Sequence, residues 1–265
     1  GGERGGIGGN GGGVILTALV TCAVARAEPQ FARDGDFDLR MVEQMARTLS
    51  ESPFAKPESS LPKALTGLEY DQYRDIRFAP EATLWAEGGQ RFRLQYLHRG
   101  FLFVDPVEIA IVSRGQARHV SYSPSQFTAG KLIPTPLPDE DIGFSGFRIL
   151  FPLNHAERFD ELAVFQGASY FRSLGRDQVY GVSARGLAIK TGDSTGEEFP
   201  AFRAFWIEEP NRFSTSLVVH ALLDSPRASG AFHFTIIPGR AVEMKVEAVL
   251  FPRSDLSKVC LAPGT

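Results

Sequence analysis

The sequence predicts an all-β protein, a large antiparallel β-sandwich with a short N-terminal helix. Phenylalanine is abundant, with 21 residues against three Met and two Trp, and Gly and Pro recur along the chain. After Tyr70 the apolar residues alternate with polar ones over short stretches that end at Gly or Pro. Short strands at this spacing, rich in aromatic residues, favour a sandwich over a parallel α/β sheet.

The bulk composition limits both the size of the fold and its partners. The chain has 265 residues, 43% of them hydrophobic, which is enough to bury a substantial core. Its formal net charge of -3 argues against nucleic acid as a partner, because nucleic-acid binders need a basic face. Neither an internal repeat nor a linker is visible after residue 70, so we expect one β-rich domain there.

The first 27 residues are typical of an export signal rather than of folded structure. A glycine-rich opening leads into the apolar run "VILTALVTCAVARA", which ends in Ala25-Arg26-Ala27. An A-x-A site after such a run indicates a signal-peptide remnant cleaved before Glu28. The run is shorter than the roughly 20 apolar residues that span a membrane. The alternative is a low-complexity leader with a chance apolar run.

Residues 36–50 carry the one strong helical pattern. In "DFDLRMVEQMARTLS" either Asp36 or Asp38 can cap the start, and Pro53 and Pro57 follow the end. The apolar positions at helical spacing are Leu39, Val42, Met45, Ala46 and Leu49. We expect this helix to pack against the sheet and to carry no chemistry.

Alternating strands follow in the middle of the chain. "RFRLQYLHRGFLF" alternates apolar and polar residues and then turns at Arg99-Gly100. "PVEIAIVSRGQARHVSYSP" repeats the pattern around a turn at Arg114-Gly115. Both are hairpin-like signals of an antiparallel sheet.

The last third gives the clearest strands. "STSLVVHALLD", "AFHFTIIPG" and "AVEMKVEAVLFPR" are separated by Gly- and Pro-containing turns. In the third segment one face is apolar and the other is nearly all charged. This pattern predicts an antiparallel strand at the edge of the sandwich.

The tract "GASYFRSLGRDQVYGVSARGLAIKTGDSTGEEFP", residues 167–200, mixes aromatic, basic, acidic and small residues. We interpret it as two strands joined by "GRD", from which Tyr170, Arg172, Tyr180 and Arg185 project. Aromatic faces, arginines and carboxylates in a preformed cleft are the groups that bind sugar rings. An equally weighted alternative makes the aromatics core residues and the arginines ordinary surface partners of the Glu197-Glu198 pair.

Several acidic residues are candidates for glycoside hydrolysis, which needs two carboxyl groups at a fixed separation. They are Glu197, Glu198, Asp224 and the triplet at 139–141. Neighbouring residues on a strand point to opposite faces, so at most one of Glu197 and Glu198 faces a given cleft. The histidines show no ligand spacing and Cys260 would be the one cysteine of the mature chain. We therefore expect no metal, no other cofactor and no disulfide.

Longer motifs resemble a known family. They are "GFSGFRILFPLN", "GASYFRSLGRDQVYGVSARGLAIKT", "GEEFPAFRAFWIE", "ALLDSPRASGAFHFTIIPG" and "KVCLAPGT". In this order they are similar to the periplasmic glucans biosynthesis proteins of the OpgG/OpgD (MdoG/MdoD) family, from about Phe37 to the end. The resemblance implies a periplasmic protein that makes osmoregulated periplasmic glucans. It also implies a galactose-mutarotase-like supersandwich followed by a smaller immunoglobulin-like domain.

The resemblance also sets the expected domain boundaries. Residues 28–265 correspond to the N-terminal part of the sandwich, the immunoglobulin-like domain is absent, and the family's catalytic acids are expected beyond Thr265. We therefore assign no catalytic residue. The positions that match family motifs are expected to line or support a cleft: Tyr170, Arg172, Tyr180, Arg185, Glu197, Glu198, Trp206, Asp224 and Arg227.

Two functions remain open at this point. Some members of the family are inverting β-1,2-glucan hydrolases, so the first expectation is binding, with hydrolysis, of a β-1,2-glucan backbone. The alternative is a non-catalytic carbohydrate-binding protein that positions glucan for the membrane-bound synthesis machinery. A purely structural sandwich is a third reading, and it predicts no glucan affinity.

Overall fold

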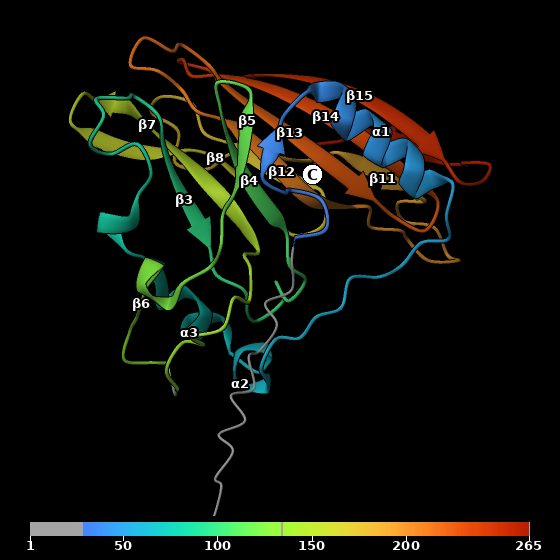
Figure 1. The fold of residues 1–265 in the computed structure, drawn as a ribbon, viewed down its shortest axis with the longest axis horizontal. Helices are drawn as coiled ribbons and strands as arrows, with labels where there is room; N and C mark the ends of the chain where they lie inside the picture. Colours follow the sequence, from blue (N-terminus) through green and yellow to red (C-terminus); the bar gives the residue numbers. More distant parts are fainter. Residues whose placement is uncertain (1–28, 134, 265) are drawn as a thin grey trace, which may run out of the picture.

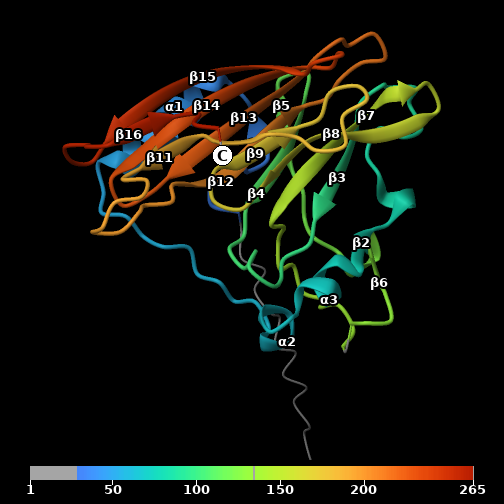
Figure 2. The ribbon, with the colours of Figure 1, turned by 180° about the vertical axis from the view of Figure 1, so that it is seen from behind.

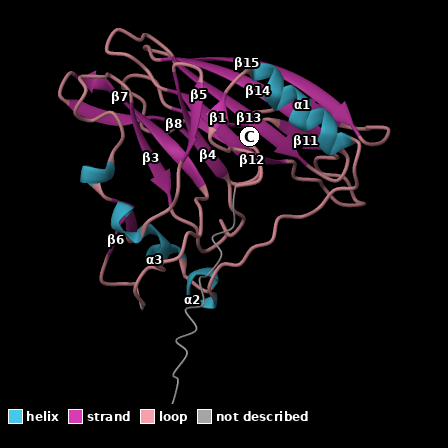
Figure 3. Cartoon of the chain, viewed as in Figure 1, coloured by secondary structure: helices cyan, strands magenta, loops and turns pink. Residues whose placement is uncertain are grey.

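The structure is a computed structural model that describes residues 29–133 and 135–264. The expected signal-peptide remnant lies outside these residues. Strands are the main regular structure of the described chain, and the few helices are short (Figure 3). The strands build two large sheets that pack face to face, together with two small two-stranded sheets. The predicted all-β sandwich is confirmed.

The larger sheet has seven strands in the order β1-β5-β4-β12-β13-β14-β15. All neighbours in it are antiparallel except β4 and β12, which run parallel. The parallel pair was not predicted from the sequence. The bounds of these strands are β1 Gly35–Asp36, β4 Glu108–Ser113, β5 Gln116–His119, β12 Ala201–Glu208, β13 Leu217–Asp224, β14 Ala228–Ile237 and β15 Glu243–Pro252.

The smaller sheet has five antiparallel strands in the order β10-β9-β8-β7-β3 and is seen best from behind (Figure 2). Its longest pair, β7 and β8, is a hairpin that runs the length of the sheet. The strand bounds are β3 Arg93–Leu97, β7 Gly146–His155, β8 Arg158–Gln166, β9 Tyr170–Ser173 and β10 Ser183–Arg185.

Phenylalanine fills the space between the two sheets. The ring of Phe147 on β7 lies 5.0 Å from that of Phe205 on β12. Phe165 and Phe171 from the smaller sheet both meet Phe234 on β14, with ring centroids 5.1 and 5.2 Å apart. Edge-to-face contacts of this kind add to the apolar burial that holds the layers together. The abundance of phenylalanine in the sequence is thus explained.

Helix α1 (Leu39–Ser50) covers the other face of the seven-stranded sheet (Figure 1). Asp38 caps it by accepting a hydrogen bond from the backbone N–H of Arg40. Val42 and Ala46 face the sheet and join a second apolar cluster that contains Trp206. The predicted helix, with one of its two candidate caps, is confirmed.

The remaining elements are short and flank the sandwich. None of the helices in the described part of the chain is long and apolar enough to cross a membrane. The bounds are α2 Lys63–Thr66, α3 Tyr70–Arg74, the 3₁₀ turns η1 Pro80–Ala82 and η2 Pro124–Gln126, and the strand pairs β2 Ile76–Phe78 with β6 Phe127–Ala129 and β11 Leu187–Ile189 with β16 Val259–Leu261.

Two details of the strand assignment can be compared with the sequence. Strand β15 does lie at an edge of the larger sheet, as its charged face predicted. In the 167–200 tract, β9 and β10 pair as expected, but the second strand begins at Ser183 rather than Gln178. The backbone N–H of Gln178 instead closes a turn on the Gly175 carbonyl, so the connection runs over residues 174–182 and not over "GRD" alone.

Candidate functional site

A cleft of about 580 Å³ opens where β12 and β13 meet the turn between β8 and β9. The segments 54–57, 102–107 and 190–199 form its other walls. Its charged lining residues are four basic and four acidic, so their formal charges cancel. These eight residues are Lys56, Asp105, Lys190, Glu197, Glu198, Arg203, Asp224 and Arg227.

The wall at 102–107 is held by the buried Arg99. Its Nε donates to the carbonyl of Val104 at 3.0 Å, and its terminal nitrogens donate to the Ile142 carbonyl and to Ser59 Oγ. Burial lowers the pKa of Arg99 to about 10, so the guanidinium stays charged at neutral pH. One side chain therefore links three separate segments of the chain, one of which, at Val104, lines the cleft.

The β8–β9 turn brings the backbone itself to the cleft. Gly167 and Ala168 both have left-handed φ angles, 76° and 44°, and both line the cavity. A Cβ atom at Gly167 would lie 3.1 Å from the ring of Phe103. Glycine is therefore favoured here by both its backbone conformation and the tight approach of Phe103.

A β-bulge aims Arg203 at the cleft. The register of β12 with β13 shifts between Phe202 and Ala204. Phe202 and Phe205 consequently both face the core between the sheets, whereas Ala204 and Trp206 face helix α1. The extra residue, Arg203, joins the cleft lining.

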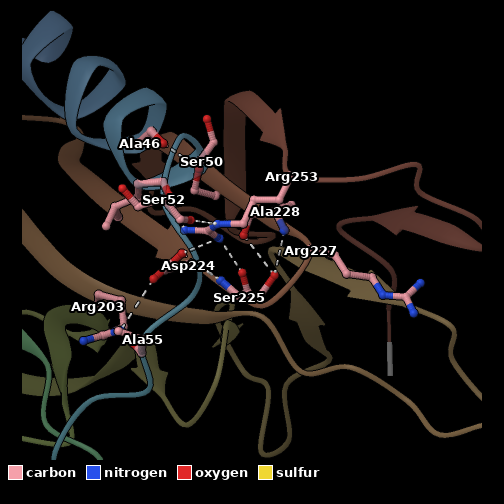
Figure 4. A network of polar contacts seen from close by, with 12 residues as sticks. Ala46, Ser50, Ser52, Ala55, Arg203, Asp224, Ser225, Arg227, Ala228 and Arg253 are labelled. Atoms are coloured by element: carbon pink, nitrogen blue, oxygen red, sulfur yellow. Dashed lines mark hydrogen bonds and ion pairs between the residues drawn. The ribbon is translucent and has the colours of Figure 1, made fainter.

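Asp224 lies at the centre of a buried ion-pair network (Figure 4). Its carboxylate accepts from Arg253 Nη1 at 2.8 Å and lies 3.6 Å from Arg203 Nη1. Arg253 also donates to the carbonyls of Ser52 and Ser225 at 2.9 and 2.5 Å. Burial raises the pKa of Asp224 although the two guanidiniums oppose this shift. The network ties the end of α1 and strand β15 to the cleft.

The two adjacent glutamates have separate arginine partners. Arg227 lies 3.4 Å from the Glu198 carboxylate and its backbone N–H also donates to that carboxylate at 3.1 Å. Arg185 donates to Glu197 and its guanidinium lies 4.9 Å from the ring centroid of Tyr170. The same guanidinium lies 5.1 Å from the ring of Phe199, which lines the cleft and is 52% exposed.

The structure divides the nine sequence-predicted residues into three groups. Glu197, Glu198, Asp224 and Arg227 line the cleft. Tyr170 and Arg185 lie directly behind this lining through the contacts to Glu197 and Phe199. The remaining three do not contribute to the lining: Arg172, Tyr180 and Trp206.

These last three residues lie in different places. Arg172 forms an ion pair with Glu161 at 2.8 Å on the smaller sheet. Tyr180 is 89% exposed in the 174–182 connection. Trp206 is fully buried beneath α1, where its ring centroid lies 5.9 Å from that of Phe37. The structure thus brings six of the nine together and separates three.

Sequence reasoning missed other residues that shape the site. Arg99 was interpreted as part of a turn, and Arg203, Arg253 and Phe199 were not selected. Most of their partners lie far away in the sequence, as for Arg99 with Ile142 and Arg253 with Asp224, so no local pattern identified them. Among the residues that the structure describes, no group of three or more His, Cys, Asp or Glu side chains is placed to hold a metal ion.

Comparison with known proteins identifies the family of this chain. The family model described as "Periplasmic glucan biosynthesis protein, MdoG" matches residues 37–265. This chain belongs to the MdoG family. Glucans biosynthesis protein G of Vibrio cholerae serotype O1 (strain ATCC 39541) is 55% identical over 236 residues, which cover 89% of this chain and 43% of that protein.

Other MdoG relatives give the same picture. Glucans biosynthesis protein G of Shewanella sp. (strain W3-18-1) is 54% identical over 236 residues, with 89% of this chain and 43% of that protein covered. Glucans biosynthesis protein G 1 of Shewanella oneidensis is 52% identical over 240 residues, covering 91% and 44%. The chain therefore spans less than half the length of these curated relatives. The family description and the names of these relatives all refer to glucan biosynthesis.

Proposed function

We propose that the cleft at the ends of β12 and β13 binds a neutral segment of glucan, with a β-1,2-linked backbone as the substrate class. The observation that carries the proposal is the charge balance of the lining, in which four basic and four acidic residues cancel. A neutral sugar offers hydroxyl groups that both donate and accept hydrogen bonds. In an arginine–carboxylate pair, the arginine can donate to a hydroxyl oxygen and the carboxylate can accept from a hydroxyl group, and the two charges compensate each other.

An aromatic surface supports the same substrate class. Phe199 lines the cleft with about half of its surface exposed, and Arg185 holds the ring from one side. An exposed aromatic face can stack on the C–H surface of a sugar ring. The membership in the MdoG family supports glucan as the saccharide.

Binding fits the carboxylates of this cleft better than hydrolysis does. Glu197, Glu198 and Asp224 each have an arginine partner. A general acid has to hold a proton near neutral pH and an activating base has to face a water molecule. Asp105 is the one lining carboxylate without an ion-pair partner among the described residues. Hydrolysis in this cleft would therefore depend on Asp105.

The experiment is a calorimetric titration of the full chain with linear β-1,2-glucan. Phe199→Ala should weaken binding about tenfold, because an exposed aromatic anchor contributes about 1–2 kcal/mol. Phe213→Ala is the matched control, since Phe213 is 76% exposed and lies outside the cleft lining. Absence of binding, or equal losses in both variants, would overturn the proposal.

A parallel incubation separates binding from turnover. The chain is mixed with linear β-1,2-glucan and the products are analysed for shorter oligosaccharides. We expect no shortening by this chain, with the affinity retained. Cleavage that is lost in Asp105→Asn would instead support hydrolysis. Affinity without cleavage also fits the alternative in which the protein positions glucan for membrane-bound synthesis enzymes.

A further inference from the structure

A second cleft, of about 610 Å³, lies at the tip of the β7–β8 hairpin and has a different chemistry. The loop before β3 and the segment around Arg176 complete it. It is remote from the first cleft along the same hairpin, because Ser145, before β7, lines the first cleft and His155, at the end of β7, lines the second. A ten-residue strand extends roughly 30 Å.

Basic groups dominate this second cleft. Arg91, Arg93, Arg176 and His155 line it, and no carboxylate is among the described lining residues. None of the three arginines forms an ion pair with a described carboxylate. This is unusual for a chain whose acidic residues outnumber its basic ones, 31 to 28.

The neighbouring acidic residues do not neutralise the cleft. Those nearest in the sequence are Glu87, Glu157, Asp160 and Asp177, and none of them lines it. The Asp160 carboxylate is already engaged, because it lies 3.4 Å from Arg158 Nε and accepts from Asn154 Nδ2 at 3.1 Å. The positive charge in the cleft is therefore uncompensated within the lining.

Packing orients two of the guanidiniums. Arg93 lies over the ring of Phe159, 3.4 Å from its centroid, and Arg91 lies over Phe151 at 4.5 Å. A guanidinium stacked on a ring keeps its N–H groups in the plane and available to a planar or tetrahedral oxyanion. The Nε atom of Arg93 is buried and has no hydrogen-bond partner. A buried donor without a partner destabilises the fold. An oxyanion bound in the cleft would be suited to accept a hydrogen bond from this Nε–H.

The third guanidinium is held by the backbone. Arg176 Nε donates to the carbonyl of Leu153 at 3.1 Å, which leaves its terminal nitrogens for a ligand. Arg91, Arg93 and Arg176 thus reach one cavity from the loop before β3, from β3 and from the 174–182 connection. Recognition of a phosphate group is favoured where several guanidinium groups, each with two or more N–H donors, converge on one site.

We propose that this second cleft binds the phosphate group of a soluble phosphate ester. Guanidinium groups bind phosphate oxygens in pairs, and three of them in a concave site compensate a dianion. A membrane headgroup is a different source of the same chemistry. It is disfavoured because none of the large exposed apolar side chains found in the described residues lines this cleft, so nothing there would insert into a bilayer.

The test titrates the full chain with inorganic phosphate and with glucose 6-phosphate, using glucose as the uncharged control. We expect both phosphates to bind and glucose not to bind at the same concentrations. The double variant Arg91→Ala/Arg176→Ala should weaken phosphate binding at least tenfold. Arg118→Ala, which removes an exposed positive charge on β5, should change it less than twofold.

Further measurements keep the proposal falsifiable. The variant Arg93→Met retains an apolar contact with Phe159 and should also lose phosphate affinity, while its circular dichroism and melting temperature report on folding. Affinity for linear β-1,2-glucan should be unchanged in both cleft variants, which separates this proposal from the first. Two results would overturn it: no phosphate binding at 10 mM, about the weakest useful affinity, or binding only to phosphatidylglycerol vesicles.

Discussion

The two clefts at opposite ends of the β7–β8 hairpin have similar volumes but different electrostatics, one with balanced charges and one basic. In the first, of about 580 Å³, basic and acidic lining residues balance and each lining arginine has a carboxylate partner. In the second, of about 610 Å³, three arginines meet no carboxylate. Pairing changes what an arginine does, because a paired guanidinium organises the wall whereas an unpaired one is available to a ligand.

The difference teaches that arginine content alone does not describe a binding surface. The side chains of Arg253 and Arg203 are largely buried around Asp224, and all three side-chain nitrogens of Arg253 donate inside the protein. Arg91 and Arg176 are exposed, and no carboxylate competes for them. The first cleft is therefore suited to a neutral ligand and the second to an anion.

The largest effect should come from removing the central acid of the first cleft. Asp224→Ala leaves two buried guanidiniums without their shared carboxylate, and we expect it to lower the free energy of unfolding by about 3–5 kcal/mol. Arg91→Ala in the second cleft should change it by less than about 1 kcal/mol, because this exposed residue has no ion-pair partner and loses only its contact with the Phe151 ring. Urea denaturation of both variants measures the two losses in the free energy of unfolding. Similar losses would contradict the contrast between the two clefts.

A pH titration should show the next largest effect, again on the side of the first cleft. Burial lowers the pKa of His98 from 6.5 to about 4, although a hydrogen bond with the Arg99 carbonyl opposes the shift. Between these values the unfolded chain binds a proton that the folded chain does not. Stability should therefore fall by up to about 3 kcal/mol as the pH drops from 6.5 to 4.

The variant His98→Gln isolates this contribution. It removes the titrating ring, so its free energy of unfolding should decline less steeply than that of the parent over the same pH range. Denaturant curves at several pH values provide the comparison. Identical slopes for parent and variant would contradict a buried neutral histidine next to Arg99.

Salt should distinguish the ligands of the two clefts more modestly. Phosphate affinity at the second cleft should fall several-fold between about 20 and 200 mM NaCl, because the Debye length shortens from roughly 20 to 7 Å. Glucan affinity at the first cleft should change less than about twofold, because a neutral sugar carries no charge for salt to screen. Calorimetry at both salt concentrations measures the two affinities. If phosphate and glucan affinity depended equally on salt, the electrostatic distinction between the clefts would be wrong.

The smallest effect is expected at Tyr180. This side chain is almost fully exposed and lies outside both cleft linings. Tyr180→Ala should change the free energy of unfolding by less than about 0.5 kcal/mol and glucan affinity by less than twofold. A loss as large as that of Phe199→Ala would show that the glucan extends across the 174–182 connection.

Local periodicity predicted the fold wherever the periodicity was strong. Helix α1 and strand β15 follow directly from helical or alternating patterns, because one face of each element is more buried than the other. Strands β13 and β14 are largely buried on both faces and were recognised instead as apolar segments between turns. The parallel contact between β4 and β12 could not be predicted in this way. It joins segments far apart in the chain, and neither segment carries a sign of its partner.

The site was predictable only in part, for reasons of register. A bulge at Arg203 decides which side of β12 each residue faces, so Trp206 turns toward α1 while Phe205 turns into the sandwich. A one-residue shift reverses every such assignment. The family motifs located Glu197, its partner Arg185 and Asp224, but the two arginine partners of Asp224 emerge only when separate strands are placed side by side.

The parallel contact between β4 and β12 also has a consequence for the order of assembly. Glu108 on β4 and Ala204 on β12 are neighbours across this pairing, although all of the smaller sheet's hairpin lies between them in the sequence. Closing so long a loop carries an entropic cost that only later contacts repay. We expect the edge of β4 to stay unpaired until β12 is in place. Pairing of these two strands should then be the rate-limiting step of folding. Until that step, the open edge is where the chain most needs protection from aggregation.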